Sequence, residues 1–248
     1  MSSAKNKTEI IYGKNACFGC IIGKNRQIYN IYILASRWNE YYDKIPNNLK
    51  LLVKKCNNRD MFILTHEENK HQGIALKVSN YNCVSIENVI DKVKDKRKVS
   101  IYLLDRVKDP HNIGNIVRTA FCFGIDAIIL PERESCGITS AVVRTSAGYT
   151  EQSLICKVVN INNAIEKLKK EGFWIIGFDV NTNTNDNLRE ILNKYNKCVF
   201  IFGSEESGIK EMTKKNCDIL IKLPMVNNAE SLNVANTTTI VGWELFNR

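Results

Sequence analysis

Three short segments decide the fold of this 248-residue chain: Asn112-Ile113-Gly114-Asn115-Ile116-Val117-Arg118, Gly203-Ser204-Glu205-Glu206-Ser207-Gly208, and Leu223-Pro224-Met225 followed by Ser231-Leu232-Asn233-Val234-Ala235. Each of these small and polar stretches begins where an apolar, strand-like run ends, or shortly after it. Ligands of open α/β sheets gather at the carboxyl ends of the strands. The three segments are therefore expected to converge on one pocket.

Short apolar runs alternate with helix-like segments from residue 99 onward. The expected strands are nearly continuous apolar runs, typical of strands buried on both faces, and they are Val99–Leu104, Ala127–Leu130, Leu154–Val159, Trp174–Phe178, Cys198–Phe202 and Ile219–Leu223. The expected helices between or after them are Ile113–Phe123, Ile161–Glu171, Asn187–Tyr195 and Ser231–Phe246. This alternation predicts an α/β fold, with a mostly parallel sheet and helices on both of its faces.

The front of the chain is predicted to form a separate, small α/β domain over residues 9–80. Its expected elements are three strands and one segment with apolar residues at helical spacing, at Ile28–Leu34, Met61–Thr65, Gly73–Val78 and Glu40–Cys56 respectively. Residues 81–98 end in a charge-dense run that is typical of a linker. The second domain is then expected to span residues 99–248.

The net charge of +9 is unevenly distributed along the chain. Residues 1–80 hold 13 Lys and Arg against 6 Asp and Glu, whereas the remaining 168 residues hold 22 against 20. A basic excess confined to one domain is typical of a module that binds a polyanion, and it favours a nucleic-acid partner.

Cysteine usage and the N-terminal sequence point to a cytoplasmic protein. The first residues lack the apolar stretch of a secretory signal, and the nine cysteines are expected to be reduced thiols. Cys17 and Cys20 are a close pair without a second pair or nearby His at zinc spacing, so we expect two buried thiols and no metal. No apolar run reaches the roughly 18 residues of a membrane span.

Taken one at a time, the three segments have plainer structural explanations. Asn112 is well placed as the N-cap of a helix that carries Arg118 as a surface residue, and Ser231 as the start of the final helix. The Gly203–Gly208 loop has the glycine spacing of a phosphate-binding loop, but Ile209 occupies the position of its lysine. The acidic side chains of the loop better suit a neutral or cationic ligand.

In their order and spacing, the three segments closely resemble the signature motifs of the SpoU (TrmH-like) family. Its members are S-adenosylmethionine-dependent RNA 2′-O-methyltransferases with a trefoil-knotted α/β fold of the SPOUT type, and the resemblance covers about residues 99–248. Further forward, Tyr12-Gly13-Lys14-Asn15-Ala16 and His71-Gln72-Gly73-Ile74 are similar to segments of one branch. That branch carries a small ribosomal-protein-like RNA-binding domain and includes the 23S rRNA guanosine 2′-O-methyltransferases that modify the peptidyl-transferase loop.

The resemblance implies roles for particular residues. The implied catalytic residues are Asn112, Arg118, Glu205, Ser231 and Asn233, and the implied cradle for S-adenosylmethionine is Gly203, Leu223, Met225 and Leu232. It further implies methyl transfer to a ribose 2′-OH without a metal, a ribosomal RNA partner, and a homodimer with active sites close to the subunit interface. Because a guanidinium is hardly ever deprotonated in proteins, our hypothesis is that Arg118 holds the target phosphate instead of acting as the base.

The sequence departs from the family pattern at two positions of the third segment. Asn227 stands where glycine is common, and Asn tolerates left-handed backbone angles better than most residues. Ala235 replaces the serine that usually ends the last motif. Other functions stay open: 2′-O-methylation of tRNA or another rRNA position, a non-catalytic RNA-binding assembly protein, or a nucleotide-binding enzyme of another class.

Overall fold

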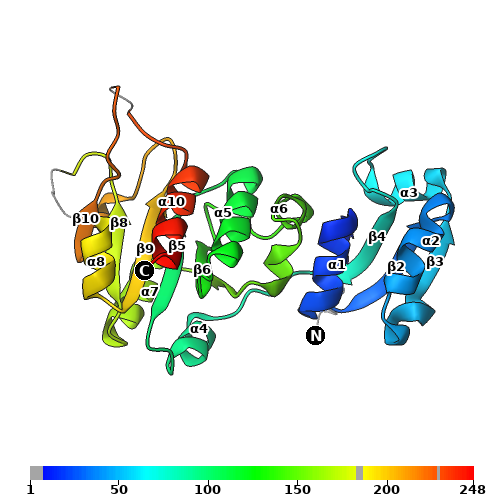
Figure 1. Cartoon of the computed structure of the whole chain (residues 1–248), viewed down its shortest axis with the longest axis horizontal. Coiled ribbons are helices and arrows are strands. Elements are labelled where there is room, and N and C mark those ends of the chain that lie inside the picture. Colours follow the sequence, from blue (N-terminus) through cyan, green and yellow to red (C-terminus); the bar gives the residue numbers. More distant parts are fainter. Residues whose placement is uncertain (1–7, 183–186, 228–229) are drawn as a thin grey trace, which may run out of the picture. The chain divides into compact units, whose positions relative to one another are not determined.

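The computed structural model describes residues 8–182, 187–227 and 230–248, and the chain forms two compact units (Figure 1). Unit 1 comprises the described residues up to Asn82 together with Ile138–Gln152. Unit 2 comprises Cys83–Gly137 and the described residues of Ser153–Arg248. No described helix has the length and apolar character that a membrane crossing requires.

Unit 2 is built on a six-stranded sheet in which every adjacent pair of strands is parallel. The strand order is β10-β8-β9-β5-β6-β7, and the strands are β5 (Val99–Asp105), β6 (Ala127–Pro131), β7 (Ile155–Val158), β8 (Trp174–Phe178), β9 (Lys197–Gly203) and β10 (Ile219–Ile221). All six lie at the apolar runs named above, so the predicted parallel α/β sheet is confirmed.

Helices cover both faces of this sheet. Along β5, the fully buried Ile101 and Leu103 belong to a core cluster with α4 (Ile86–Val93) and α7 (Ile161–Lys170). Tyr102 alternates with them, and its hydroxyl donates to the carbonyl oxygen of Thr238 in α10 (Val234–Phe246) at 2.8 Å. Helix α10 packs in turn against two others, α5 (Pro110–Cys122) and α8 (Leu188–Lys194), whereas α9 (Glu211–Lys215) packs against α7.

The predicted linker over residues 81–98 contains a folded element instead. Helix α4 begins after Ser85, which forms a capping box with Asn88. Its buried Ile86, Val89 and Val93 recur at helical spacing and contribute to the core of unit 2. The charged side chains between them occupy the exposed face of an amphipathic helix, which explains why the segment resembles a linker in composition.

Unit 1 contains a four-stranded sheet of order β1-β4-β2-β3. Its elements are β1 (Thr8–Tyr12), α1 (Lys14–Gly23), β2 (Ile28–Leu34), η1 (Ala35–Arg37), α2 (Trp38–Tyr41), η2 (Tyr42–Lys44), η3 (Asn47–Leu52), β3 (Val53–Cys56), α3 (Asn58–Thr65) and β4 (Ile74–Ser79), followed later in the chain by α6 (Ser140–Thr145) and η4 (Tyr149–Gln152). The late segment is held by a fully buried ion pair, with Arg26 Nε 2.9 Å from Glu151 Oε1.

Two expectations for unit 1 are wrong. The expected strand Met61–Thr65 is the second half of α3, and the expected helix over Glu40–Cys56 is divided among the end of α2, η2, η3 and the strand β3. In α3, Asn57 caps the first turn and Met61 and Thr65 are buried four residues apart, so helical packing of one face overrides the strand propensity of the apolar run.

The two close cysteines are buried thiols, as predicted. Cys17 and Cys20 lie on α1 within the core of unit 1. Burial raises the pKa of Cys17 well above its ordinary value and raises the pKa of Cys20 to about 12. Both groups are therefore neutral thiols at physiological pH and poor nucleophiles.

Candidate functional site

The Gly203–Gly208 loop closes tightly on itself at the carboxyl end of β9. The backbone N–H of Gly208 donates to the carbonyl oxygen of Ser204 at 2.9 Å. A Cβ atom at Gly203 would lie 2.0 Å from the carbonyl carbon of Gly208, which is backbone and has no room to shift. Position 203 therefore requires glycine, and the loop keeps a fixed shape.

An ion pair between the buried Asp105 and the partly buried Arg106, at the end of β5, contacts both sides of this loop. Asp105 pairs with Gly203 in the sheet, and its carboxylate accepts from the backbone N–H of Lys210 at 2.8 Å. Arg106 Nε lies 3.4 Å from the Asp105 carboxylate, and Arg106 Nη2 donates to the carbonyl oxygen of Gly208 at 3.1 Å. Arg106 adopts a left-handed backbone (φ +63°), which is uncommon for a residue other than glycine.

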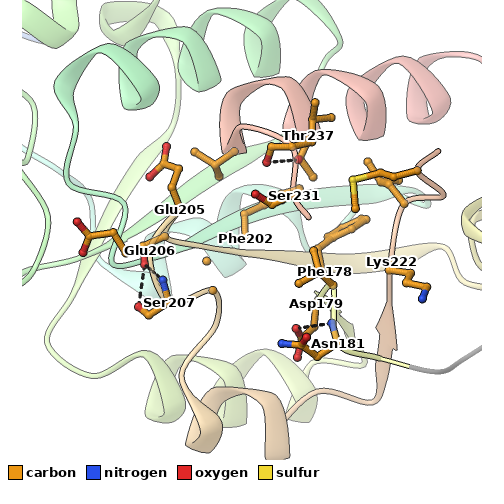
Figure 2. A pocket seen from close by; sticks show the side chains of 18 of the residues that line it. Phe178, Asp179, Asn181, Phe202, Glu205, Glu206, Ser207, Lys222, Ser231 and Thr237 are labelled. Carbon is orange, nitrogen blue, oxygen red and sulfur yellow. Dashed lines mark hydrogen bonds between the residues drawn. The ribbon is translucent and has the colours of Figure 1, made fainter. Parts of the chain in front are cut away.

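A cavity of about 310 Å³ opens at the carboxyl ends of β8, β9 and β10. Of the nine residues that the sequence assigns to the site, six line it: Gly203, Glu205, Leu223, Met225, Ser231 and Leu232. Figure 2 shows Glu205 and Glu206 on one side of the view and Phe178, Asp179 and Lys222 on the other, with Phe202 between them. The lining thus combines apolar surface with carboxylates.

Asn112 and Asn233 do not line the cavity but join its wall through hydrogen bonds. The side-chain amide of Asn112 donates to Glu205 Oε1, and Asn112 Oδ1 accepts from the amide of Asn233 at 3.2 Å. The three residues come from α5, the glycine loop and the start of α10. The structure therefore brings one residue from each signature segment into a single amide–carboxylate network.

Arg118 lies apart from this network. It is exposed on α5, about 9 Å along the helix axis from Asn112 by the rise per residue. Within the described ranges, no hydrogen bond or ion pair joins its guanidinium to another residue, and it does not line the cavity. Its position leaves the guanidinium available to a ligand that arrives from solvent.

Two predicted helix caps are placed differently in the structure. Asp109, not Asn112, caps α5, and Pro110 occupies the first helical position, where its missing N–H costs nothing. The amide of Asn112 is consequently free to bind Glu205 and Asn233. The final helix begins at Val234 with Asn233 as its N-cap, so Ser231 precedes the helix instead of starting it.

Several lining residues escaped the sequence-based prediction. Phe178 and Phe202 stack with ring centroids 4.9 Å apart at the ends of β8 and β9. Asp179 accepts from Lys214 Nζ at 2.7 Å, and this hydrogen bond raises the pKa of Lys214. Phe178, Asp179 and Phe202 lie at the ends of strands or directly after them and form no motif, so the available signal was the rule that ligands gather at strand ends.

The turn at Asn227 agrees with the expectation drawn from its chemistry. Asn227 adopts a left-handed backbone with φ +58°, the conformation that glycine and asparagine tolerate best. Asparagine can therefore replace glycine at this position while the turn is kept.

The cavity lies at the carboxyl edge of a parallel sheet, its lining is both apolar and acidic, and an amide–carboxylate network borders it. This arrangement is typical of an α/β protein with a site for a small organic ligand. Residues 100–243 match the SpoU rRNA Methylase family. The match covers more than half of the chain, and the protein belongs to this family. As a member, it is an RNA methyltransferase that uses S-adenosylmethionine.

Individual relatives resemble the chain over nearly its whole length. It is 30% identical to the 23S rRNA (guanosine-2′-O-)-methyltransferase RlmB of Coxiella burnetii, with 97% of this chain and 96% of that protein covered. It is 34% identical to an uncharacterized tRNA/rRNA methyltransferase of Synechocystis sp. over 98% of this chain, but it spans only 63% of that protein. The SpoU methyltransferase AviRb from Streptomyces viridochromogenes in complex with AdoMet shares the fold, with a TM-score of 0.77, 16% identity and coverage of 97% and 90%.

The cavity suits S-adenosylmethionine in size and chemistry. A volume of about 310 Å³ lies within the range of small-molecule sites. Leu223, Met225 and Leu232 offer apolar surface for an adenine, and Glu205 and Glu206 place negative charge where a sulfonium cation would be favoured. Lys222 supplies a positive charge for a carboxylate. The donor set therefore fits an amphipathic, zwitterionic cofactor.

Proposed function

We propose that this chain methylates a ribose 2′-OH in ribosomal RNA, and specifically a guanosine in the peptidyl-transferase loop of 23S rRNA. The observation that carries the proposal is the network that joins Glu205, Asn112 and Asn233 beside the cavity. Similarity to the Coxiella burnetii RlmB over 97% of this chain and 96% of that protein, together with the basic unit 1, favours ribosomal RNA as the substrate.

Four residues of the cavity would hold the cofactor. Gly203 lets the loop backbone approach, and Leu223, Met225 and Leu232 enclose the adenine. When bound, S-adenosylmethionine supplies a methyl group made electrophilic by its sulfonium. The apolar side chains also exclude water, which would otherwise compete with the ribose hydroxyl and weaken the electrostatic interactions of the site.

The amide network would orient the target ribose. Asn112 and Asn233 are held by their contacts to Glu205 and to each other, and Asn233 is further fixed because its Oδ1 accepts from the backbone N–H of Ala235 at 2.8 Å. Ser231, at the rim of the cavity, would support this orientation. Alignment of a weak nucleophile with its electrophile contributes several kcal/mol to a barrier, roughly 7–11 in the best cases.

Arg118 would bind the phosphate next to the target ribose and stabilise negative charge as the hydroxyl loses its proton. We expect Arg118→Lys to keep part of the activity with an unchanged pH profile, because a lysine retains the positive charge. Methyl transfer by the variant and the parent should be measured from pH 6.5 to 9.5. Activity that recovers only at raised pH would contradict this role and indicate a titrating base.

The proposed function is tested with methyl-labelled S-adenosylmethionine and 23S rRNA from cells that lack ribose methylation. Products are mapped by alkaline hydrolysis, to which a 2′-O-methylated linkage is resistant. A single protected linkage in the peptidyl-transferase loop is the expected result. Protection of a different rRNA linkage, or methylation of tRNA supplied in a parallel reaction, would overturn this substrate assignment in favour of 2′-O-methylation at that other RNA site. From the cysteine usage, we also propose that the protein acts in the cytoplasm.

We also propose that the chain acts as a homodimer through the outer face of α10. Trp243 and Phe246 are 53% and 64% exposed on this helix. They cluster with Phe123, whose ring centroid lies 6.2 Å from that of Trp243. A contiguous exposed aromatic surface of this kind marks an interaction site. The trefoil knot that the family resemblance implies stays a prediction.

A charge placed on this face should separate the subunits. We expect Ile240→Glu combined with Phe246→Glu to reduce the mass in solution from two chains to one chain of 28.3 kDa, because two carboxylates cannot be desolvated without partners. Light scattering after size exclusion measures the mass. Val159→Glu, at an exposed apolar position outside α10, is the control. A parent protein that itself runs as one chain would contradict the dimer.

A further inference from the structure

Unit 1 contains an open groove of about 560 Å³ that the proposed catalytic chemistry does not use. Its lining combines cationic, amide and aromatic side chains with one carboxylate, and it is formed by Leu34, Arg37, Asn58, Arg59, Phe62, Glu68, Asn69, His71, Gln72 and Gly73. The residues come from the end of β2, from η1, from α3 and from the turn before β4. All of them belong to one compact unit, so the groove is complete within it.

The turn that forms one wall of the groove is held in a fixed conformation. Gln72 and Gly73 adopt left-handed backbones with φ +52° and +83°. The hydroxyl of Tyr41 donates to the carbonyl oxygen of Gln72 at 2.8 Å, and the backbone N–H of Lys14 donates to Gln72 Oε1 at 2.9 Å. A left-handed non-glycine residue is costly and persists where the surroundings determine it, often at a ligand site.

His71 presents an unused donor at this wall. The side chain is buried, at 7% exposure, yet it lines the groove. Its Nδ1 accepts from the backbone N–H of Gly73 at 2.9 Å, so the neutral ring carries its proton on Nε2. Across the described residues, Nε2 makes no hydrogen bond. Although the residue as a whole is buried, Nε2 itself is not a buried atom lacking a partner, so it keeps access to solvent and can donate to a ligand in the groove.

The groove also offers the two interactions that an RNA strand requires. Arg59 is exposed, and among the described residues its guanidinium has neither an ion-pair nor a hydrogen-bond partner, whereas Arg37 is paired with Glu40 at 2.8 Å. Phe62 is 47% exposed beside it on α3. An arginine suits a phosphate, and a half-exposed aromatic ring suits an unstacked base.

We propose that this groove binds one unstacked nucleotide of the RNA substrate. Arg59 contacts the phosphate, Phe62 stacks on the base, and His71 Nε2 donates to a base or ribose oxygen. Glu68 gives the groove an acceptor for an exocyclic amino group of the base, as carboxylates do in base recognition. The proposal rests on the proposed function in taking RNA as the ligand, but it places the contact outside the catalytic site.

The test uses the full-length protein and a hexaribonucleotide with one central 2-aminopurine, whose fluorescence falls when it stacks. Phe62→Ala should remove the fluorescence change and weaken binding by about tenfold or more. Arg59→Ala should weaken binding about three- to tenfold at 100 mM salt and make the salt dependence shallower by about 0.7–0.9 in log–log slope. Ile63→Ala and Lys44→Ala are the matched controls, because both side chains are exposed and lie outside the groove.

The outcomes separate this groove from the proposed function. Selective loss in Arg59→Ala and Phe62→Ala supports the groove, even where the parent fails to methylate 23S rRNA and the substrate assignment falls. Equal binding by all four variants overturns the groove, and it does so even where the parent methylates the peptidyl-transferase loop. Weakening in all four variants to the same extent also overturns it, because a diffuse surface of unit 1 would then carry the RNA.

Discussion

An Asn112→Ala variant is expected to bind S-adenosylmethionine as the parent does but to methylate RNA about 10²–10³-fold more slowly. Asn112 is the central member of the network, because its amide donates to Glu205 and its oxygen accepts from Asn233. Its loss leaves both neighbours without the contact that fixes their side chains at the proposed ribose site. Removal of one preorganised polar group typically costs a reaction this much.

The matched control is Asn115→Ala on the same helix. Asn115 is exposed on α5, and its side chain makes no hydrogen bond within the described ranges, so the exchange should leave the rate unchanged. Single-turnover methylation and cofactor titration measure the two effects separately. An Asn112→Ala variant that methylates as fast as Asn115→Ala would show that the network is structural, and a variant that loses cofactor affinity instead would move Asn112 into the cofactor site.

The sheet of unit 2 could be predicted because strands buried on both faces have nearly continuous apolar sequences. Cys198–Phe202 is apolar at every position and Val99–Leu104 at every position except Ser100, and the structure buries β5 and β9 on both faces. That pattern depends only on local sequence and on the covering helices. In unit 1 the same reasoning failed for Met61–Thr65, because a helix with one packed face can also contain a short apolar run.

Site residues that lie within sequence motifs could be predicted. Site residues that are joined only by contacts between distant segments could not. Glu205 and Ser231 were found because each lies in a recognisable segment, and both line the cavity. Asp105 and Lys210 are joined by a hydrogen bond across 105 positions, and nothing local marks either residue. The same holds for the segment around α6, which joins unit 1 through the buried Arg26–Glu151 pair.

Asp105 gives the second large effect. Asp105→Ala is expected to weaken S-adenosylmethionine binding by at least tenfold and to destabilise the fold by about 3–5 kcal/mol. The exchange removes the acceptor for the Lys210 N–H and leaves the Arg106 guanidinium without its buried counter-charge. Arg106 then loses its fixed position under the carbonyl oxygen of Gly208, so the loop that forms one wall of the cavity is no longer held.

A second carboxylate variant, which loses the same kinds of contact away from the glycine loop, isolates the effect on the cofactor. Asp218 also pairs a carboxylate with a backbone N–H and a cation, since it accepts from Ile175 at 2.8 Å and from Lys169 at 2.6 Å. Because Ile175 lies near the amino end of β8, Asp218→Ala should lower the melting temperature without changing cofactor affinity. Calorimetric titration well below the unfolding transition compares the variants. If the two variants bind S-adenosylmethionine equally well, the Asp105–Arg106 pair supports the fold alone and the shape of the glycine loop is set by its own backbone contacts.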